Sequence, residues 1–175
     1  MSRFLHVVPY TTGRSLAAAY NEVVEKADQS FDWILITDAD VMFLTPTYGH
    51  LIQEAIDKHP DAGILTCLTN RIGATSQLTK DGKMGSADLL HLRNVALERY
   101  KQYGSTITRI RPPVSGFFML FPRIAWKRVG GFRGSGRLGI DWDFSYRISA
   151  AGLPIYRMEG LFVAHFYRLD GRSAS

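Results

Sequence analysis

Two aspartates one residue apart, Asp38 and Asp40, directly follow the apolar run WILIT at residues 33–37. Two carboxylates this close repel each other unless a cation or a shared proton lies between them. In an α/β sheet, ligands bind beyond the carboxyl ends of the strands, which is where a strand at 33–37 would deliver both side chains. Mg²⁺ and Mn²⁺ prefer oxygen ligands and bridge readily to substrate phosphates. The spacing therefore indicates a metal or phosphate site, while a solvated turn capped by Asp38 is the alternative that the same residues allow.

A second acidic pair and one histidine complete the set of candidate catalytic residues. Asp141 and Asp143 stand in GIDWDFSYRI, where we expect them in the first turn of a helix. Carboxylates there interact favourably with the helix dipole, so a structural role explains them, and a general base is the functional alternative. His165, late in LFVAHFY, is either a structural residue at a strand end or a metal ligand.

Other patterns in the sequence exclude competing kinds of site. GSGRLG at 134–139 has the G-x-G-x-x-G spacing, but a helix end and a loop precede it, whereas a dinucleotide fingerprint directly follows a strand. We interpret it as part of a flexible loop, 132–139, that closes over a ligand. The histidines show neither metalloprotease nor zinc-ribbon spacing, which leaves zinc sites of those kinds unsupported.

The elements that must position these residues alternate between strands and helices in the first half of the chain. Ser15 is expected to cap one helix, Thr45 with Pro46 to begin another, and Gly104 to end a third. A polar loop at 69–85 is expected to be mobile. We expect strands at 4–10, 31–37, 62–68, 105–110, 116–121, 153–159 and 161–167, and helices at 15–27, 45–60, 86–104, 123–131 and 141–152.

This order of elements predicts an α/β fold. Alternating strands and helices form a parallel sheet covered by helices, so we expect a Rossmann-like domain with a mostly parallel central sheet and helices on both faces. In the second half of the chain the order of strands and helices is mixed, which predicts a small mixed second sheet. The 175 residues suffice for one domain with a full core, so we expect a single domain at 1–175.

Composition narrows the class of protein. Hydrophobic residues make up 46% and charged residues 21%, which argues against a disordered chain. Cys67 is the sole cysteine, which excludes an intramolecular disulfide and suits a reducing compartment. No run approaches the roughly 20 apolar residues of a membrane span, so we expect a cytoplasmic protein without a transmembrane segment. The net charge of +5 and the pI near 9.5 favour anionic partners.

Four segments, taken in order, resemble glycosyltransferases of the GT-A fold, namely family 2 and the polypeptide N-acetylgalactosaminyltransferases. VVPYTTGRSLAAAYNEVV resembles their nucleotide-binding strand, turn and helix, and FDWILITDADVMF resembles the strand that delivers their metal-binding Asp-x-Asp. PPVSGFFMLFPRIAWKRVGGF resembles the segment before the catalytic helix. GIDWDFSYRISAAGLPIYRMEGLFVAHFY resembles the segment with their catalytic acidic residues and late histidine. The resemblance covers nearly the whole chain.

The resemblance implies a reaction and a metal site. The reaction would move a sugar from a nucleotide-diphosphate donor to a carbohydrate or other hydroxyl-bearing acceptor, as a hexosyltransferase does. A UDP-linked donor is favoured, and GDP-mannose is the next choice. Asp40 would bind the metal directly, Asp38 would contact the metal, the ribose or both, and His165 would complete the site. An imidazole beside carboxylates favours Mn²⁺ over Mg²⁺.

The same matches imply roles for the other site residues. Asp141 aligns with the catalytic aspartate, and Asp143 with the next acidic position. The residues expected to contact the nucleotide or the donor sugar are Pro9, Tyr10, Thr11, Asn21, Asp38, Ser115 and Gly116. The basic residues available to support the phosphates are Lys127, Arg133 and Arg137.

The sequence also departs from the family pattern. Ile140 stands where the family has a glutamate before the catalytic aspartate, so both inverting and retaining chemistry stay open. The strand and helix that usually precede the Asp-x-Asp strand are absent, which predicts a minimal version, with 1–70 as the nucleotide- and metal-binding half and 71–175 as the acceptor-binding half. No Q-x-x-R-W motif follows, which argues against a processive polysaccharide synthase.

Two other functions remain as alternatives. A haloacid-dehalogenase-like phosphatase would use Asp38 as its nucleophile, although that family carries the motif on its first strand. A basic nucleic-acid-binding domain would fit the pI, but it has no use for two aspartates at the end of a buried strand, and no basic motif interleaved with aromatic residues is present. We therefore expect no nucleic-acid partner.

Overall fold

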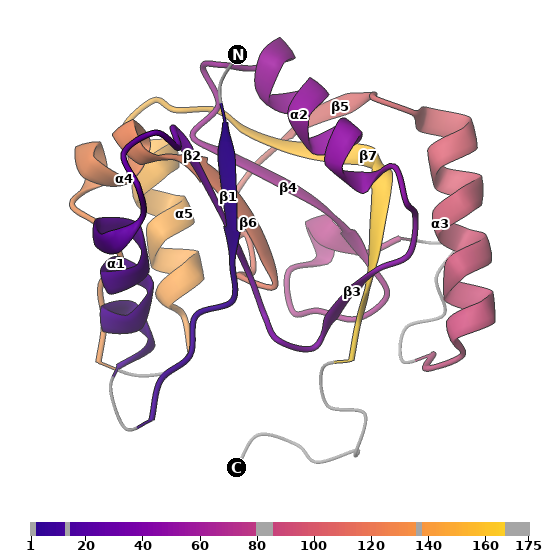
Figure 1. The fold of residues 1–175 in the computed structure, drawn as a ribbon, viewed down its shortest axis with the longest axis horizontal. Helices are drawn as coiled ribbons and strands as arrows, with labels where there is room; N and C mark the ends of the chain where they lie inside the picture. Colours follow the sequence, from indigo (N-terminus) through magenta and orange to yellow (C-terminus); the bar gives the residue numbers. More distant parts are fainter. Residues whose placement is uncertain (1–2, 13–14, 80–85, 136–137, 167–175) are drawn as a thin grey trace.

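One mixed sheet with helices on both faces forms the protein (Figure 1). The computed structural model describes residues 3–12, 15–79, 86–135 and 138–166. The strands are β1 Phe4–Val7, β2 Trp33–Thr37, β3 Val41–Phe43, β4 Ile64–Thr69, β5 Ile107–Ile110, β6 Phe118–Pro122 and β7 Ile155–His165. The helices are α1 Leu16–Lys26, α2 Tyr48–Lys58, α3 Leu89–Tyr103, α4 Arg123–Val129 and α5 Ile140–Ala150, with a short 3₁₀ turn, η1 Thr75–Gln77.

The sheet has the order β1-β2-β6-β4-β7-β3, and β5 also pairs with β7. The long strand β7 pairs with β4 along one edge, whereas β5 and β3 pair in succession along the other edge. This arrangement confirms the α/β single domain with helices on both faces. The expected small second sheet is not separate, because β7 joins β3 and β5 to the main sheet.

The expectation of a mostly parallel sheet was wrong in detail. Only β1–β2 and β4–β7 run parallel, while the four other pairings are antiparallel. Two of these antiparallel pairings come from β6, which lies late in the chain but inserts between β2 and β4, and the other two come from β3 and β5, which both pair with β7. Alternation of elements along the sequence gives no sign of such an insertion, because it depends on contacts between distant segments.

Residues in β2 show why the sheet is covered on both faces. Ile34 and Ile36 pack into the cluster beneath α1, α4 and α5, whereas Trp33 and Leu35 pack into the cluster beneath α2. Successive side chains of a strand point to opposite faces, so a fully apolar strand must be buried on both. A third cluster packs α3 against β4 and β7.

The helix termini match most of the sequence expectations. The Ser15 hydroxyl accepts from the backbone N–H of Ala18, and Gly104 ends α3 with a φ of +46°. The predicted start of α2 at Thr45 and Pro46 was wrong, because the helix begins at Tyr48 after Thr47. Among the described residues, no helix has the length and apolar character needed to cross a membrane.

The strand boundaries differ in two places. The sequence predicted neither β3, which is only Val41–Phe43, nor the continuity of β7, which was expected as two strands. At Gly160, in the middle of β7, a Cβ atom would overlap the carbonyl oxygen of Gly104, where α3 ends. The absence of a side chain at Gly160 therefore lets the end of α3 lie directly against the strand.

Candidate active site and metal centre

The turn between β2 and β3 brings the first aspartate pair to the end of β7. Asp38 follows β2, and its backbone N–H donates to the carbonyl of Phe117. Val41 of β3 pairs with His165 of β7, and the N–H of Phe166 donates to the carbonyl of Asp40. Backbone pairing, and not side-chain contact alone, therefore places both carboxylates beside the histidine.

His165 faces these carboxylates from a buried position. Its side chain is 1% exposed, and Nε2 lies 3.2 Å from Oδ1 of Asp40 and 3.5 Å from Oδ2 of Asp38. Nδ1 lies 2.8 Å from the carbonyl oxygen of Arg71. A carbonyl oxygen can only accept, so Nδ1 carries the proton, and Nε2 is the nitrogen directed at the aspartates. In proteins, metal-binding histidines are oriented by a hydrogen bond of this type, which the ring nitrogen that does not bind the metal donates.

The electrostatics of this group reflect the crowding of negative charge. Burial alone would lower the pKa of His165, but its hydrogen bonds with Asp38 and Asp40 raise the pKa to about 9. The hydrogen bond to His165 in turn lowers the pKa of Asp40. Without a metal, the imidazolium balances the two carboxylates. A divalent cation would take over that role and displace the proton from Nε2.

These residues fit a metal ion. One ligand atom from each of Asp38, Asp40 and His165 lies within 4.8 Å of the others, which is close enough for a shared cation. Two carboxylate oxygens and one imidazole nitrogen are a donor set that suits Mn²⁺. The two aspartates are also partly exposed, at 41% and 45%, so a ligand can reach the group from solvent.

A pocket of about 590 Å³ opens beside the metal group. Asp38 and His165 line one part of it, and the start of α5 lines another. The other lining residues come from α1, the segment 115–117, residues 72–73 and the approach to α5: Leu16, Tyr20, Ile72, Gly73, Ser115, Gly116, Phe117, Leu138, Gly139, Ile140, Asp141 and Trp142. Ser115 and Gly116, which the sequence analysis expected beside the donor sugar, therefore line this pocket.

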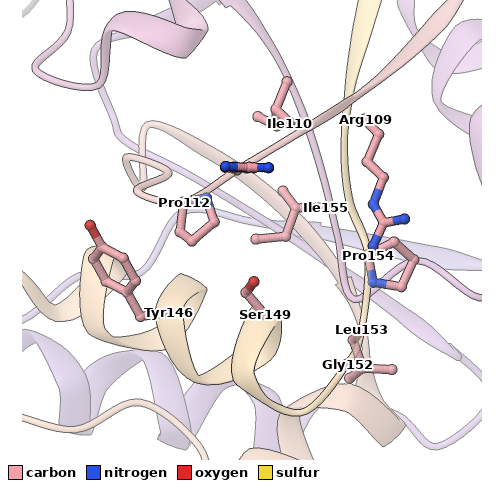
Figure 2. Close-up of a pocket in the computed structure, with 10 residues that line it drawn as sticks. Arg109, Ile110, Pro112, Tyr146, Ser149, Gly152, Leu153, Pro154 and Ile155 are labelled. Carbon is pink, nitrogen blue, oxygen red and sulfur yellow. The ribbon is translucent and has the colours of Figure 1, made fainter.

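A larger cavity of about 750 Å³ lies elsewhere, at the C-terminal part of α5 (Figure 2). It is lined by none of the candidate catalytic or metal-binding residues. We therefore take the smaller pocket as the candidate active site, because chemistry requires the reactive groups and not merely the volume.

Asp141 is held in the pocket by backbone hydrogen bonds. The N–H of Gly116 donates to Oδ2 at 2.7 Å, and the N–H of Trp142 donates to Oδ1 at 3.0 Å. Burial, with a smaller contribution from the negative charge of Asp38, raises the pKa of Asp141 against the opposing effect of these hydrogen bonds. A carboxylate with a raised pKa is a better proton acceptor, which suits a general base. Burial and the same two aspartates also raise the pKa of Tyr20, so its hydroxyl is neutral.

Gln77 is a residue of this site that the sequence did not reveal. Its fully buried side chain accepts from the N–H of Ser115 at 2.7 Å and donates to the carbonyl of Ser115 at 3.2 Å. Nε2 also donates to Oγ1 of Thr66 at 2.7 Å. Gln77 thus fixes the backbone next to Gly116, which holds Asp141. No sequence signal points to it, because it lies in the polar segment that was expected to be a mobile loop.

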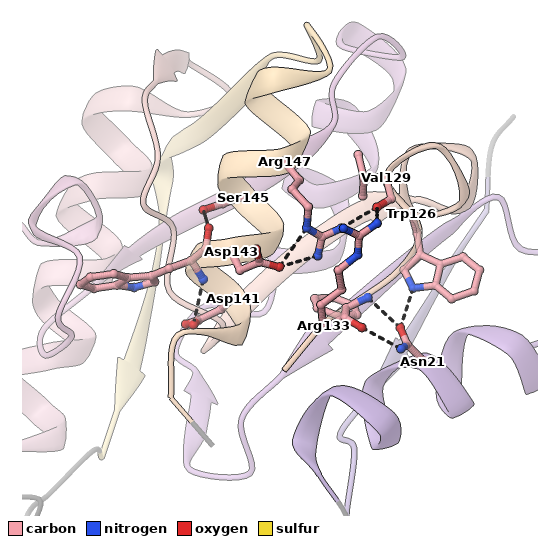
Figure 3. A network of polar contacts seen from close by, with 10 residues as sticks. Asn21, Trp126, Val129, Arg133, Asp141, Asp143, Ser145 and Arg147 are labelled. Atoms are coloured by element: carbon pink, nitrogen blue, oxygen red, sulfur yellow. Dashed lines mark hydrogen bonds and ion pairs between the residues drawn. The ribbon is translucent and has the colours of Figure 1, made fainter. Parts of the chain in front are cut away.

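Two predicted site residues form polar contacts outside this pocket (Figure 3). Asn21 accepts from Nε1 of Trp126 and from the N–H of Phe132, and it donates to the carbonyl of Phe132. Asp143 pairs with Arg147 at 2.7 Å, one turn further along α5. The structure does not bring either residue into the pocket with Asp141.

The remaining expected contacts also lie outside the lining of this pocket. Pro9, Tyr10 and Thr11 follow β1, and the side chain of Tyr10 is 84% exposed. Among the basic residues, Arg133 donates to the carbonyl of Val129, and Lys127 is exposed on α4. Arg137 lies outside the described residues.

A family model described as "Glycosyltransferase like family 2" matches residues 3–173. The chain belongs to this family. It is accordingly a glycosyltransferase domain, as the resemblance implied. No curated protein matches the chain.

Solved structures share the fold of this family 2 domain. GalNAc-T7 with UDP, GalNAc and Mn²⁺ is 18% identical with a TM-score of 0.63, and the match covers 93% of this chain but 32% of that one. The Drosophila β1,4-galactosyltransferase 7 catalytic domain with xylobiose is 14% identical with a TM-score of 0.60, covering 100% and 75%. A mutant of that Drosophila enzyme with manganese, UDP-galactose and xylobiose is 14% identical with a TM-score of 0.55, covering 99% and 74%. Identities this low show the GT-A-like fold alone.

Proposed function

We propose that this glycosyltransferase uses a UDP-linked sugar with Mn²⁺ and transfers the sugar to an acceptor hydroxyl. The observation that carries the proposal is the convergence of Asp38, Asp40 and His165 at the edge of the pocket that holds Asp141. Two structures with the same fold are complexes with UDP or UDP-galactose and manganese, which supports this choice of donor and metal.

Asp38, Asp40 and His165 would hold the metal ion. When bound there, it would act as a Lewis acid toward the departing nucleoside diphosphate. The protein's own part is to present two carboxylate oxygens and the Nε2 lone pair together, with Nδ1 fixed by the carbonyl of Arg71. Asp38 also lines the pocket, so it is placed to contact the ribose as well.

Asp141 would accept the proton of the attacking hydroxyl group. Its Oδ2 is oriented by the N–H of Gly116, and its raised pKa increases its basicity. This role requires inversion at the sugar carbon, because the base and the leaving group lie on opposite faces. In a retaining enzyme, which the isoleucine at Ile140 leaves open, Asp141 would position the acceptor instead.

The donor sugar would occupy the part of the pocket near Ser115 and Gly116. The backbone N–H of Ser115 donates to Gln77, and its hydroxyl oxygen lies 3.4 Å from Nε1 of Trp142. Its position is therefore fixed on two sides. Pro9, Tyr10 and Thr11 would contact the base, since the segment follows β1, the neighbour of β2 in the sheet.

The proposal is tested by thermal shift and calorimetry with UDP, GDP and CDP, each with and without Mn²⁺. We expect UDP with Mn²⁺ to stabilise the domain most, by about 2.7 kcal/mol at a hundredfold excess over Kd. Asp40→Ala should abolish the part of this stabilisation that depends on Mn²⁺. Asp61→Ala, at an exposed position, should leave that part unchanged. If no nucleotide stabilises the domain, or if Asp40→Ala retains full Mn²⁺-dependent binding, the proposal is wrong.

Product analysis separates this function from the phosphatase alternative. A glycosyltransferase incubated with a UDP-sugar releases UDP as the sugar passes to an acceptor hydroxyl group or to water, whereas a phosphatase with Asp38 as nucleophile releases inorganic phosphate from simple phosphate esters. We expect UDP release that depends on Mn²⁺ and on Asp141. Phosphate release from a generic ester, lost in Asp38→Asn, would favour the phosphatase.

A further inference from the structure

The larger cavity, of about 750 Å³, is formed by three elements (Figure 2). The strand β5 and the residues after it provide one wall, the C-terminal part of α5 provides another, and the start of β7 closes the pocket. Its lining consists of Arg109, Ile110, Arg111, Pro112, Tyr146, Ser149, Gly152, Leu153, Pro154 and Ile155. It shares no lining residue with the candidate active site. Its volume lies within the range of about 300–1,000 Å³ that is typical of small-molecule sites.

The charge of this cavity is positive and uncompensated. Arg109 and Arg111 both line it, and no aspartate or glutamate is among the described residues that line it. Neither arginine forms an ion pair with a carboxylate of the described part of the chain. By contrast, Arg99 pairs with Glu159, and Arg147 pairs with Asp143. Two unpaired guanidinium groups at one cavity attract an anion and can bind its oxygens in a bidentate manner.

The helix side of the cavity provides hydroxyl groups. Tyr146 and Ser149 are three residues apart on α5, so they lie on the same face of the helix. Figure 2 shows the Ser149 side chain directed from α5 toward Ile155, and the Tyr146 side chain at the left of the cavity, on the opposite side from Arg109. Hydroxyl groups both donate and accept, which suits a ligand that carries several hydroxyl groups.

Apolar surface separates these two polar sides. Pro112, Leu153, Pro154 and Ile155 are apolar lining residues of the cavity, and Figure 2 shows Pro112 and Ile155 between Arg109 and the side chains of Tyr146 and Ser149. A small molecule that fits must therefore place an anionic group at one side, hydroxyl groups at the other, and carbon surface between them. A sugar with a carboxylate or phosphate substituent has this distribution of groups.

We propose that this cavity is a binding site for an anionic sugar, whose carboxylate or phosphate pairs with Arg109 and Arg111 and whose hydroxyl groups contact Tyr146 and Ser149. The proposal does not depend on the proposed transfer reaction, since the two sites share no residue. It predicts binding in the absence of any metal or nucleotide.

The test measures binding by calorimetry or ligand-observed NMR in the presence of EDTA, which removes any contribution from the metal group. The probes are glucose 6-phosphate, glucuronate, neutral glucose and inorganic phosphate. We expect both anionic sugars to bind and glucose to bind at least about tenfold more weakly, because hydrogen bonds to charged groups are the stronger ones. Comparison of the phosphate sugar with the carboxylate sugar shows which anion the cavity prefers.

Variants assign the binding to this cavity. Arg109→Gln combined with Arg111→Gln should weaken binding of the anionic sugars by about tenfold or more, while Arg93→Gln, an exposed arginine on α3, should change it less than about twofold. Tyr146→Phe keeps the ring and removes the hydroxyl group, so binding should weaken by a few-fold. Circular dichroism and the melting temperature confirm that each variant is folded.

Three outcomes would overturn the proposal. Equal binding of glucose and of the anionic sugars would remove the role of the arginines. Equal weakening by the cavity variant and by Arg93→Gln would show a general effect of net charge. If inorganic phosphate binds as tightly as glucose 6-phosphate, the sugar part of the ligand contributes nothing to binding.

Discussion

The two cavities of this domain differ in how their charged groups are held. In the candidate active site, His165 is buried between a carbonyl group and two aspartates, and Asp141 accepts two backbone hydrogen bonds. In the arginine-lined cavity, Arg109 and Arg111 stand at exposed positions of the chain. The first site is organised before a ligand arrives, as catalysis requires, whereas the second can adjust its long side chains to a ligand. Substitutions should therefore disturb reactivity at the first site and affinity at the second.

The sharpest contrast is expected from Asp141→Asn. The amide keeps the shape of the side chain but cannot accept a proton, so turnover should fall by about 10²–10⁴-fold. Binding of UDP with Mn²⁺ should stay within about twofold, because Asp141 is not part of the metal group. Steady-state kinetics and calorimetry on the same preparation measure both quantities. Unchanged turnover would exclude Asp141 as the base.

A smaller effect is expected at the metal group from His165→Gln. Loss of the imidazole ligand should weaken Mn²⁺ binding by at least the roughly 10–100-fold that loss of a residue supporting a metal ligand costs, as measured by calorimetry with Mn²⁺ alone. His50→Gln, at an exposed position on α2, is the matched control. Binding of anionic sugars in the other cavity should not change. If both histidine variants bind Mn²⁺ like the unchanged protein, the three-residue metal group is wrong.

Gln77→Leu tests whether the backbone around Ser115 must be held in place. The substitution leaves the N–H and carbonyl of Ser115 without their buried partner, which should destabilise the domain by about 1–3 kcal/mol. It should also lower kcat with a smaller change in KM, because Asp141 depends on the adjacent Gly116. Gln77→Glu restores an acceptor for the N–H of Ser115 and should recover part of kcat. A loss of stability with unchanged kcat would limit Gln77 to a structural role.

The last prediction concerns pH and the stability of the metal-free protein, with no effect expected on either cavity when metal is bound. His165 has a folded-state pKa of about 9, above its unfolded value of about 6.5. Its protonation therefore stabilises the fold fully below about pH 6.5, and this contribution is lost as the pH rises through about 9. The loss should reach a few kcal/mol at most, measured by urea unfolding in EDTA over this range. The unfolding free energy of His165→Gln should not fall with pH in this way. If it falls equally in the variant, another group causes the pH dependence.

The sequence predicted the parts of the candidate site that lie at the ends of apolar runs. Asp38 and Asp40 could be placed at the end of a strand from the apolar run before them, whereas their grouping with His165 came from the resemblance to GT-A glycosyltransferases. The structure joins the three residues through the pairing of β3 with β7. Asn21 and Asp143, which were expected from the same resemblance, lie outside the lining of the pocket that holds Asp141. A polar side chain at a helix surface serves packing as readily as ligand binding, and residue type does not distinguish the two.

Sequence patterns could not predict the contacts between segments that are distant along the chain. Gln77 joins Thr66 and Ser115, which are 11 and 38 residues away. The arginine-lined cavity exists because β5 pairs with the outer edge of β7 beside α5, and neither arginine has a motif around it. The insertion of β6 between β2 and β4 has the same origin. Residue patterns report local structure, whereas these features follow from the topology.

The close approach at Gly160 limits how this protein can be altered. One end of β7 begins at Ile155, in the wall of the arginine-lined cavity, and the other ends at His165. Any side chain at position 160 would push α3 outward or bend the strand, and a bend midway along a continuous strand would shift both of its ends. An engineer who wishes to alter one cavity without the other should therefore leave this position as glycine and work from the loops.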